Sequence, residues 1–388
     1  MRGFVWLDHP LNLSTPSSPS HPIPKLSSNT SSLPYSHKHG NRAALRLSRI
    51  VSDSLRLNLP DIRWFVMCDD DTVFLPDNLL HVLSHFDHTQ PYYIGSLSES
   101  HLQNIYFSYS MAYGGAGFAI SYPLAVSLSR IQDQCLHRYP ALYGSDDRIQ
   151  ACMAELGVPL TRHPGFHQYD VYGDLLGLLA AHPVAPLVSL HHLDVVNPIF
   201  PSSPSRVSAL RRLFSGPVSL DSPATMQQSI CYDKSNQWTV SVSWGFVIQI
   251  LRGFMSPREM EMPARTFLNW YRRADYTAYA FNTRPVARNP CQRPVYYYLS
   301  SSSYDVRLRT TVTAYERHRD AQPACRWRIA NPSQHVDTVI VYKKPDPDLW
   351  NRAPRRNCCR VKPVGKGDGE RTMTIDVGVC RDGEISEI

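Results

Sequence analysis

The sequence has few charged residues and no long uninterrupted apolar run, and both absences restrict what the protein can be. Charged residues make up only 19% of the 388 residues, so the chain as a whole is not a disordered polyelectrolyte. The most apolar stretch, residues 175–188, is interrupted by prolines and is shorter than the ~20 residues that a membrane span needs. The opening apolar run is broken by Asp8, His9 and Pro10, which excludes a signal peptide. Any membrane anchor is therefore expected to precede Met1.

The cysteines do not form a metal-binding pattern. None of the nine belongs to a C-x-x-C pair, which argues against a structural zinc site. Six of them are spread over the second half of the chain, which favours disulfides made in a secretory compartment, and the odd total leaves at least one thiol over. Two glycosylation sequons, at Asn12 and Asn29, agree with a luminal glycoprotein.

Basic residues are in mild excess but are not clustered. The formal charge is +7 and the sequence pI is about 8.9. No basic cluster with interleaved aromatic residues and no recognition-helix pattern is present, so we expect no nucleic-acid partner. A mild excess suits an anionic ligand such as a nucleotide diphosphate, and it is equally compatible with no such ligand.

The first half of the sequence alternates predicted strands and helices. A Ser/Pro-rich segment at 10–37 predicts a loop or a disordered segment. A helix is expected from about Arg42 to Pro60, with Asn41 as its cap and Ala44, Leu47, Val51 and Leu55 on its inner face. The apolar run 64–68 predicts a strand buried on both faces, as in a mostly parallel sheet. This alternation predicts an α/β fold.

The pattern changes after about residue 200. Residues 238–244 alternate as a half-buried strand does, and residues 339–342 predict another strand. We therefore predict three parts: a partial N-terminal strand with a Ser/Pro-rich loop, a catalytic α/β domain, and a smaller β-rich domain that contains cysteines. Their expected bounds are 1–40, 41–200 and 201–388.

Three aspartates, Asp69, Asp70 and Asp71, directly follow the apolar run. Ligands of open α/β sheets bind beyond the carboxyl ends of strands. Adjacent carboxylates repel one another unless a cation joins them, and their oxygens suit Mn²⁺ or Mg²⁺. The triplet therefore indicates a metal site that could hold a nucleotide diphosphate, with a solvated acidic turn as the alternative.

Three weaker motifs accompany the triplet. Gly114-Gly115-Ala116-Gly117 allows backbone to approach a ligand closely, although an ordinary tight turn uses glycine in the same way. Asp146 and Asp147 start a predicted helix, where they could act as a general base or simply cap the helix. His191 and His192 could complete a metal shell, or one could be a buried, hydrogen-bonded histidine.

Taken together, these motifs resemble those of the Fringe-like β1,3-glycosyltransferases (glycosyltransferase family 31). Residues 64–74 resemble the strand and D-D-D motif of that family, and residues 114–118 resemble its G-G-A-G-aromatic motif. The order and spacing of the acidic pair and the histidine pair also fit. Over nearly the whole chain the sequence is similar to a plant group whose C-terminal part is a domain of unknown function; residues 143–148 and 166–170 are typical of it.

The resemblance implies a GT-A-type (Rossmann-like) fold whose first nucleotide-binding strands are missing here. It implies an inverting transfer of a hexose or N-acetylhexosamine from a UDP-sugar to a hydroxyl of a glycan or glycoprotein, with Mn²⁺ or Mg²⁺ as cofactor. The setting it implies is the Golgi lumen, with the full-length form a type II membrane protein. It also implies a disulfide between Cys135 and Cys152 near the site.

The resemblance assigns roles residue by residue. Asp71 and His192 would bind the metal, Asp69 would face the metal or the ribose, and Asp70 would lie near the donor sugar. Asp147, in preference to Asp146, would be the catalytic base. The glycines expected at the nucleotide sugar are Gly114, Gly115 and Gly117.

Two other functions compete with this one. A carbohydrate-binding relative without turnover is favoured by the missing strands and disfavoured by the intact acidic motifs. A metal-dependent phosphotransferase or hydrolase would need a nucleophile or a second metal cluster, and the sequence offers neither.

Overall fold

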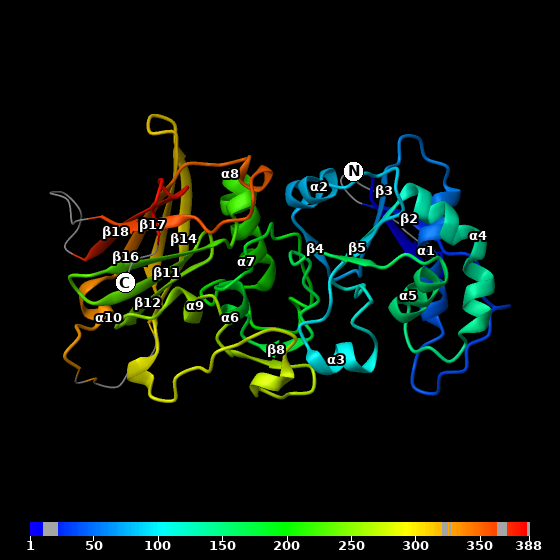
Figure 1. Ribbon diagram of the computed structural model, residues 1–388, viewed down its shortest axis with the longest axis horizontal. Coiled ribbons are helices and arrows are strands. Elements are labelled where there is room, and N and C mark those ends of the chain that lie inside the picture. Colours follow the sequence, from blue (N-terminus) through cyan, green and yellow to red (C-terminus); the bar gives the residue numbers. More distant parts are fainter. Residues whose placement is uncertain (11–21, 320–324, 326, 363–370, 386–388) are drawn as a thin grey trace. The chain divides into compact units, whose positions relative to one another are not determined.

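The protein folds into two compact units of mixed α/β structure, and the computed structural model describes residues 1–10, 22–319, 325, 327–362 and 371–385 (Figure 1). The first unit comprises Met1–Thr72, Ser84–Ser98 and Gln103–Gln168. The second comprises Val73–Leu83, Glu99–Leu102 and Tyr169–Ile388. The predicted boundary at residue 200 therefore falls within the second unit.

The first unit is built on a four-stranded sheet with the order β3-β6-β5-β7. Strand β6 runs antiparallel to both β3 and β5, and only β5 and β7 are parallel, so the expectation of a mostly parallel sheet is wrong. The sheet is mixed because the chain returns as β6 between the two earlier strands β3 and β5. The helices and strands up to β7 that lie wholly or mostly in this unit are β1 (Phe4–Leu7), β2 (Ile23–Leu26), α1 (Ala43–Arg56), β3 (Trp64–Met67), β5 (Tyr93–Gly95), α3 (His101–Tyr106), β6 (Phe118–Ser121), α4 (Tyr122–Arg138), α5 (Asp146–Glu155) and β7 (Leu160–Arg162).

The predicted helix before β3 is confirmed as α1, with a shifted inner face. Asn41 Oδ1 accepts a hydrogen bond from the Ala43 backbone amide at 2.8 Å, which ties the start of the helix. Val51 is buried as expected, whereas Leu47 is 46% exposed and Leu45 is completely buried in its place. Strand β3 is also less buried than expected, because Phe65 is its single buried residue.

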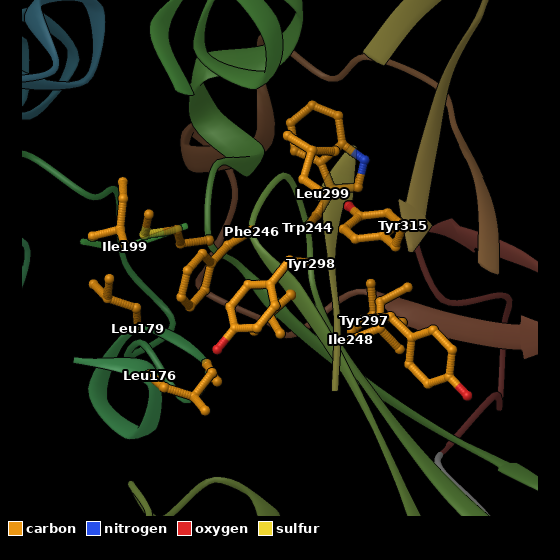
Figure 2. Packing of buried hydrophobic residues seen from close by; sticks show 14 of the residues in the cluster. Leu176, Leu179, Ile199, Trp244, Phe246, Ile248, Tyr297, Tyr298, Leu299 and Tyr315 are labelled. Atoms are coloured by element: carbon orange, nitrogen blue, oxygen red, sulfur yellow. The ribbon is translucent and has the colours of Figure 1, made fainter. Parts of the chain in front are cut away.

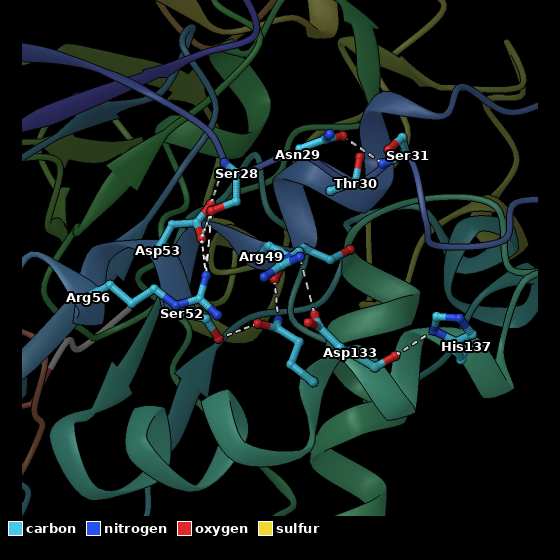
Figure 3. Close-up of polar contacts among 12 residues, drawn as sticks. Ser28, Asn29, Thr30, Ser31, Arg49, Ser52, Asp53, Arg56, Asp133 and His137 are labelled. Carbon is cyan, nitrogen blue, oxygen red and sulfur yellow. Dashed lines mark hydrogen bonds and ion pairs between the residues drawn. The ribbon is translucent and has the colours of Figure 1, made fainter.

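The Ser/Pro-rich segment is more ordered than predicted, although its residues 11–21, and with them the Asn12 sequon, lie outside the described residues. Ile23–Leu26 forms β2 and pairs in parallel with β1. The buried carboxylate of Asp53 on α1 accepts hydrogen bonds from the Ser28 amide at 3.0 Å and the Ser28 hydroxyl at 2.7 Å (Figure 3). Arg56 donates to the same carboxylate at 2.9 Å. This cluster holds the segment against α1, which composition alone does not reveal.

A disulfide between Cys135 on α4 and Cys152 on α5 confirms the predicted pair, with Cα atoms 5.8 Å apart. Replacing both cysteines by serine is expected to lower the free energy of unfolding by about 3 kcal/mol, because the bond closes a short loop in the unfolded chain. Denaturant titration of the oxidised protein measures this. Cys68→Ser is the control: because Cys68 forms no disulfide, this substitution should leave the stability nearly unchanged. Equal losses in both variants would contradict the expectation.

The second unit contains an eight-stranded sheet with the order β10-β11-β12-β14-β15-β16-β18-β17. Its helices and strands, up to the histidine pair, are β4 (Val73–Phe74), α2 (Pro76–Ser84), β8 (Val171–Gly173), α6 (Leu176–Leu179) and β9 (Ser189–Leu190). Those that follow are α7 (Arg206–Leu213), η1 (Phe214–Val218), α8 (Ser219–Asp221), η2 (Ser222–Ala224), β10 (Gln228–Asp233), β11 (Trp238–Ser243), β12 (Val247–Arg252), α9 (Pro257–Met260), β13 (Phe267–Asn269), η3 (Tyr276–Ala278), η4 (Pro290–Gln292), β14 (Val295–Asp305), β15 (Thr310–Arg317), α10 (Pro332–His335), β16 (Thr338–Lys343), η5 (Leu349–Asn351), β17 (Cys358–Val361) and β18 (Thr372–Gly378).

The core of the second unit is rich in aromatic side chains. Phe246 packs against Phe200 and Tyr298, with ring centroids 5.8 Å and 6.0 Å apart, and Figure 2 shows the rings of Phe246 and Tyr298 beside Leu176 and Leu179 of α6. The predicted strand at 238–244 is confirmed as β11, but all six of its residues are buried rather than half of them. The predicted strand at 339–342 is confirmed within β16, where burial alternates.

Three disulfides join the remaining cysteines of the second unit, as the cysteine spread predicted. They are Cys231–Cys359, Cys291–Cys325 and Cys358–Cys380. Cys68 is the thiol left over. A total of four disulfides suits an oxidising compartment. Within the described ranges, every helix is too short or too polar to span a membrane.

Candidate active site

The first unit brings the aspartate triplet beside the glycine turn. Strand β3 ends at Met67, and the triplet forms the loop that follows it. Thr72, directly after the triplet, donates its hydroxyl to the Gly115 carbonyl at 2.9 Å. Gly117 has φ +77°, a left-handed conformation that favours glycine, so this residue is needed for the turn into β6. Two motifs that lie more than forty residues apart in sequence therefore share one edge of the sheet.

Asp146 joins this group from the start of α5. Its Oδ2 accepts a hydrogen bond from the Gly114 amide at 2.8 Å, and its Oδ1 accepts one from the Ser145 hydroxyl at 3.1 Å. A Cβ at Gly114 would lie 2.7 Å from Asp146 Oδ1, so any side chain here would displace the carboxylate. The Asp146 carboxylate thus packs directly against Gly114, the first glycine of the motif.

The surroundings of Asp146 favour its protonated form. Burial raises the pKa of its carboxyl to about 7, the Gly114 hydrogen bond opposes this shift, and the negative charge of Asp69 adds to it. A carboxyl with a pKa near neutrality can take up and release a proton under physiological conditions, which is what a general base requires. A cation bound at the neighbouring aspartates would offset the contribution of Asp69.

Asp147 has different partners, all in its own loop. Its Oδ2 accepts from the Tyr143 amide at 2.8 Å and its Oδ1 from the Gly144 amide at 3.0 Å. The guanidinium of Arg148 lies 3.9 Å away and donates to the Gly144 carbonyl at 2.5 Å. Both oxygens of Asp147 therefore hold the backbone of the preceding loop, whereas Asp146 reaches across to the glycine turn.

Gly114→Ala is expected to lower activity about 10-fold to 100-fold while leaving the fold intact, because the new methyl group would displace the Asp146 carboxylate. Steady-state transfer kinetics measure the loss, and the melting temperature reports on the fold. Gly144→Ala is the matched control, since its Cβ would meet Asp147 Oδ1 at an ordinary 3.7 Å. Wild-type activity in Gly114→Ala would show that Asp146 can move freely.

The histidine pair lies in the second unit, directly after β9. Strand β9 pairs antiparallel with β4, with Val73 opposite Leu190. The rings of His191 and His192 are 3.7 Å apart, and Nδ1 of His192 lies 3.4 Å from the Tyr169 carbonyl. His192 has φ +53°, an uncommon conformation for a residue with a side chain.

Strand pairing explains why the histidines and Asp71 can share an ion. Asp71 precedes Val73 by two residues, and the histidines follow Leu190, so the β4–β9 register carries all three side chains to the same end of the two strands. Among the described residues, Asp71, His191 and His192 form a group whose ligand atoms could hold a metal ion. Carboxylates suit Mn²⁺ and Mg²⁺ whereas imidazoles suit transition-metal ions, so a set of one carboxylate and two imidazoles favours a transition-metal dication such as Mn²⁺ over Mg²⁺. From the sequence, both histidines are candidate metal ligands, with His192 preferred. Both belong to this group, whereas Asp69 does not.

Two neighbours of the histidines carry no motif in the sequence. Glu99 is buried, accepts a hydrogen bond from the Tyr169 amide at 2.6 Å, and has a pKa raised to about 7, mainly by burial and against the influence of His191. Trp270 stacks on His192 with ring centroids 5.2 Å apart. Neither could be found from sequence, because each reaches the site through a pairing between distant segments.

Comparisons with known proteins agree with these motifs. Residues 18–184 match a family described as Fringe-like, and residues 103–359 match one described as "Protein of unknown function, DUF604". A β-1,3-glucosyltransferase of Mus musculus is 32% identical over 141 residues, which is 35% of this chain and 27% of that protein. A β-1,3-glucosyltransferase of Homo sapiens is 31% identical over 105 residues, which is 27% of this chain and 20% of that protein.

The chain thus spans about a quarter of the length of the curated relatives it matches. The predicted enzyme class, a glycosyltransferase, is supported by the Fringe-like match and by both relatives, while the likeness to a plant group stays a prediction. The match to residues 103–359 extends over more than half of the sequence. The chain therefore belongs to the DUF604 family, and it carries a Fringe-like domain at residues 18–184.

Proposed function

We propose that the chain is a metal-dependent, inverting glycosyltransferase that moves a hexose or N-acetylhexosamine from a UDP-sugar to a sugar hydroxyl, in β1,3 linkage. The observation that carries this proposal is the grouping of Asp71 with His191 and His192 beside the Fringe-like motifs. The β-1,3-glucosyltransferase names of the two relatives support the linkage type and make glucose the first donor sugar to test.

Asp71, His191 and His192 would hold Mn²⁺ or Mg²⁺, which when bound supplies positive charge to the diphosphate of the leaving UDP. Asp69 and Asp70, on the same loop, are proposed to face the ribose and the donor sugar. The glycine turn offers a backbone amide to the donor, and Gly115 is the candidate there: the Gly114 amide already donates to Asp146, and the Gly117 amide donates to the Gly114 carbonyl at 2.9 Å.

The transfer step needs a base on the acceptor side. An acceptor hydroxyl gives its proton to a carboxylate, its oxygen forms a bond to the anomeric carbon, and the bond from that carbon to the diphosphate oxygen breaks with its electron pair leaving on UDP. We propose Asp146 for this base, because it lies beside the glycine turn and its burial raises its pKa to about 7. The resemblance favours Asp147, which remains the alternative and is tested against Asp146 below.

The Golgi lumen is the proposed location of the protein. Four disulfides and a sequon whose Asn29 is exposed are compatible with the Golgi lumen, where nucleotide sugars are used on glycoproteins and polysaccharides. The acceptor would be a glycan or glycoprotein. A luminal pool of this chain that carries an N-linked glycan at Asn29 would support the setting.

Calorimetric titration of UDP into the protein, with and without Mn²⁺, tests the donor site directly. The proposal expects binding that depends on Mn²⁺, followed by transfer from UDP-glucose or another UDP-sugar to a glycan acceptor. Binding of a glycan without any need for UDP or Mn²⁺ would favour the carbohydrate-binding alternative. Binding of neither ligand would refute the proposal for this chain.

A further inference from the structure

Five planar groups of the second unit form a continuous stack that ends on the histidine pair. The Arg272 guanidinium lies over the Tyr172 ring at 5.5 Å. Tyr172 stacks on Trp270 at 4.8 Å with an interplanar angle of 10°, and Trp270 stacks on His192 at 5.2 Å with an angle of 9°. His191 continues the stack at 3.7 Å from His192.

The stack is not part of the apolar core. Neither Tyr172 nor Trp270 belongs to the buried cluster of this unit, and Trp270 is only half-buried. A tryptophan that only fills space would be expected among aliphatic neighbours. Here the Trp270 ring stacks nearly parallel on a tyrosine and on a candidate metal ligand, an arrangement that planar groups favour.

A tight turn aims Trp270 at His192. Strand β13 pairs antiparallel with β8, with Leu268 opposite Tyr172, and Trp270 follows the strand. The turn is closed by hydrogen bonds from the Arg273 amide to Asn269 Oδ1 and from the Arg272 amide to the Asn269 carbonyl, both at 2.7 Å. Trp270 is thus held in place by its own backbone before it meets the histidine.

His192 needs such support more than an ordinary ligand does. Its backbone is in the left-handed region with φ +53°, and Tyr169, whose carbonyl faces its Nδ1, has φ +50°. Nδ1 directed at a carbonyl leaves Nε2 as the nitrogen for a metal. The parallel ring of Trp270 then fixes the plane in which Nε2 points.

We propose that Trp270 is a positioning residue that orients the His192 imidazole for metal binding, so that the C-terminal part of the chain completes the site of the Fringe-like part. This inference rests on the proposed function, since it assumes a divalent cation at His192. Trp270 lies beyond residues 18–184 of the Fringe-like match and within residues 103–359 of the DUF604 match. The C-terminal part would then serve the reaction rather than merely adjoin the catalytic domain.

The test measures the binding of Mn²⁺ alone to the full chain. The unbound ion is detected by its electron paramagnetic resonance signal, so the readout does not depend on activity. Trp270→Ala is expected to weaken Mn²⁺ binding about 10-fold to 100-fold, as loss of an outer partner of a metal-bound histidine does. Trp270→Phe should restore most of the affinity, because it keeps an aromatic face. Trp270→Leu keeps apolar bulk without that face and should bind as weakly as Trp270→Ala.

Tyr276→Ala is the matched control, because this nearby tyrosine is 74% exposed, and it should bind Mn²⁺ like the wild type. Melting temperatures separate loss of affinity from loss of fold; should Trp270→Ala unfold, the comparison of Trp270→Phe with Trp270→Leu decides. Wild-type affinity in Trp270→Leu would overturn this inference and leave the proposed function standing. No Mn²⁺ binding by the wild type, even with UDP, would overturn both.

Discussion

Replacing Asp71 by asparagine is expected to lower kcat/KM for sugar transfer about 1000-fold. Asparagine keeps the size of the side chain and removes the negative charge that a divalent cation needs, and the charge stabilisation lost with the cation is several kcal/mol. Asp71 supplies the single carboxylate in the group with His191 and His192, so its loss leaves the group without an anionic ligand. Affinity for UDP in the presence of Mn²⁺ should fall in parallel.

Initial rates over a range of Mn²⁺ concentrations measure this effect. A weakened but intact site should recover part of the activity at high Mn²⁺, which distinguishes loss of the ion from loss of the fold. Asp77→Asn is the control, since Asp77 is an exposed acid in the first turn of α2 and should change the rate little. An Asp71→Asn variant that transfers sugar at the wild-type rate without added metal would refute metal dependence.

The local elements of the site could be predicted because they depend on neighbouring residues. The helix α5 begins at Asp146 as expected, and the glycine turn leads into β6. The disulfide between Cys135 and Cys152 was implied by the resemblance and is confirmed. A short motif and its spacing were sufficient for the helix and the turn, whereas the disulfide came from the resemblance alone.

The pairings between distant segments could not be predicted. Periodicity identified the strand β3 but not its antiparallel neighbour β6, and it gave no sign that β13 pairs with β8. Trp270 reaches His192 only through that second pairing, so no pattern around residue 270 distinguishes it from other tryptophans. Contacts of this kind depend on strand order, which a single sequence does not encode locally.

Burial was predicted only in part, for the strands as for α1, whose expected inner residue Leu47 is exposed. The strand β11 alternates in sequence as a half-buried strand does, yet all six residues are buried because polar residues such as Ser241 and Ser243 are covered as well. Ser243 donates its hydroxyl to the Leu179 carbonyl at 3.0 Å, which makes its burial tolerable. The polar serines of β11 therefore suggested exposure, although hydrogen bonds within the protein replace the contacts with water that such residues usually need.

The second large effect is expected at the acidic pair. Asp146→Asn should lower kcat about 100-fold to 10000-fold, the usual range for loss of a general base. Asp147→Asn should have a smaller effect, because its oxygens hold the Tyr143 and Gly144 amides rather than facing the glycine turn. A larger loss in Asp147→Asn would assign the base to Asp147, as the resemblance alone suggests.

The pH dependence provides a sharper distinction. A base must be unprotonated, so wild-type kcat/KM should fall about tenfold per pH unit on the acid side of the Asp146 pKa, with a midpoint near 7, or lower when a bound cation offsets the charge of Asp69. This acid limb should vanish in Asp146→Asn and persist in Asp147→Asn. An unchanged limb in Asp146→Asn would remove Asp146 from the mechanism.

Stability at different pH values shows whether such a loss arises from unfolding. The folded-state pKa of Asp146 is raised from its ordinary value of 3.8 to about 7, mainly by burial, so the native protein binds this proton more tightly than the unfolded chain does. Its contribution to stability is fully present below pH 3.8 and declines as the pH rises to about 7. Asparagine cannot ionise and can still accept from the Gly114 amide, so Asp146→Asn should be at least as stable as the wild type at pH 8. If Asp146→Asn loses activity without losing stability, the loss is caused by removal of the ionisable carboxylate and not by unfolding.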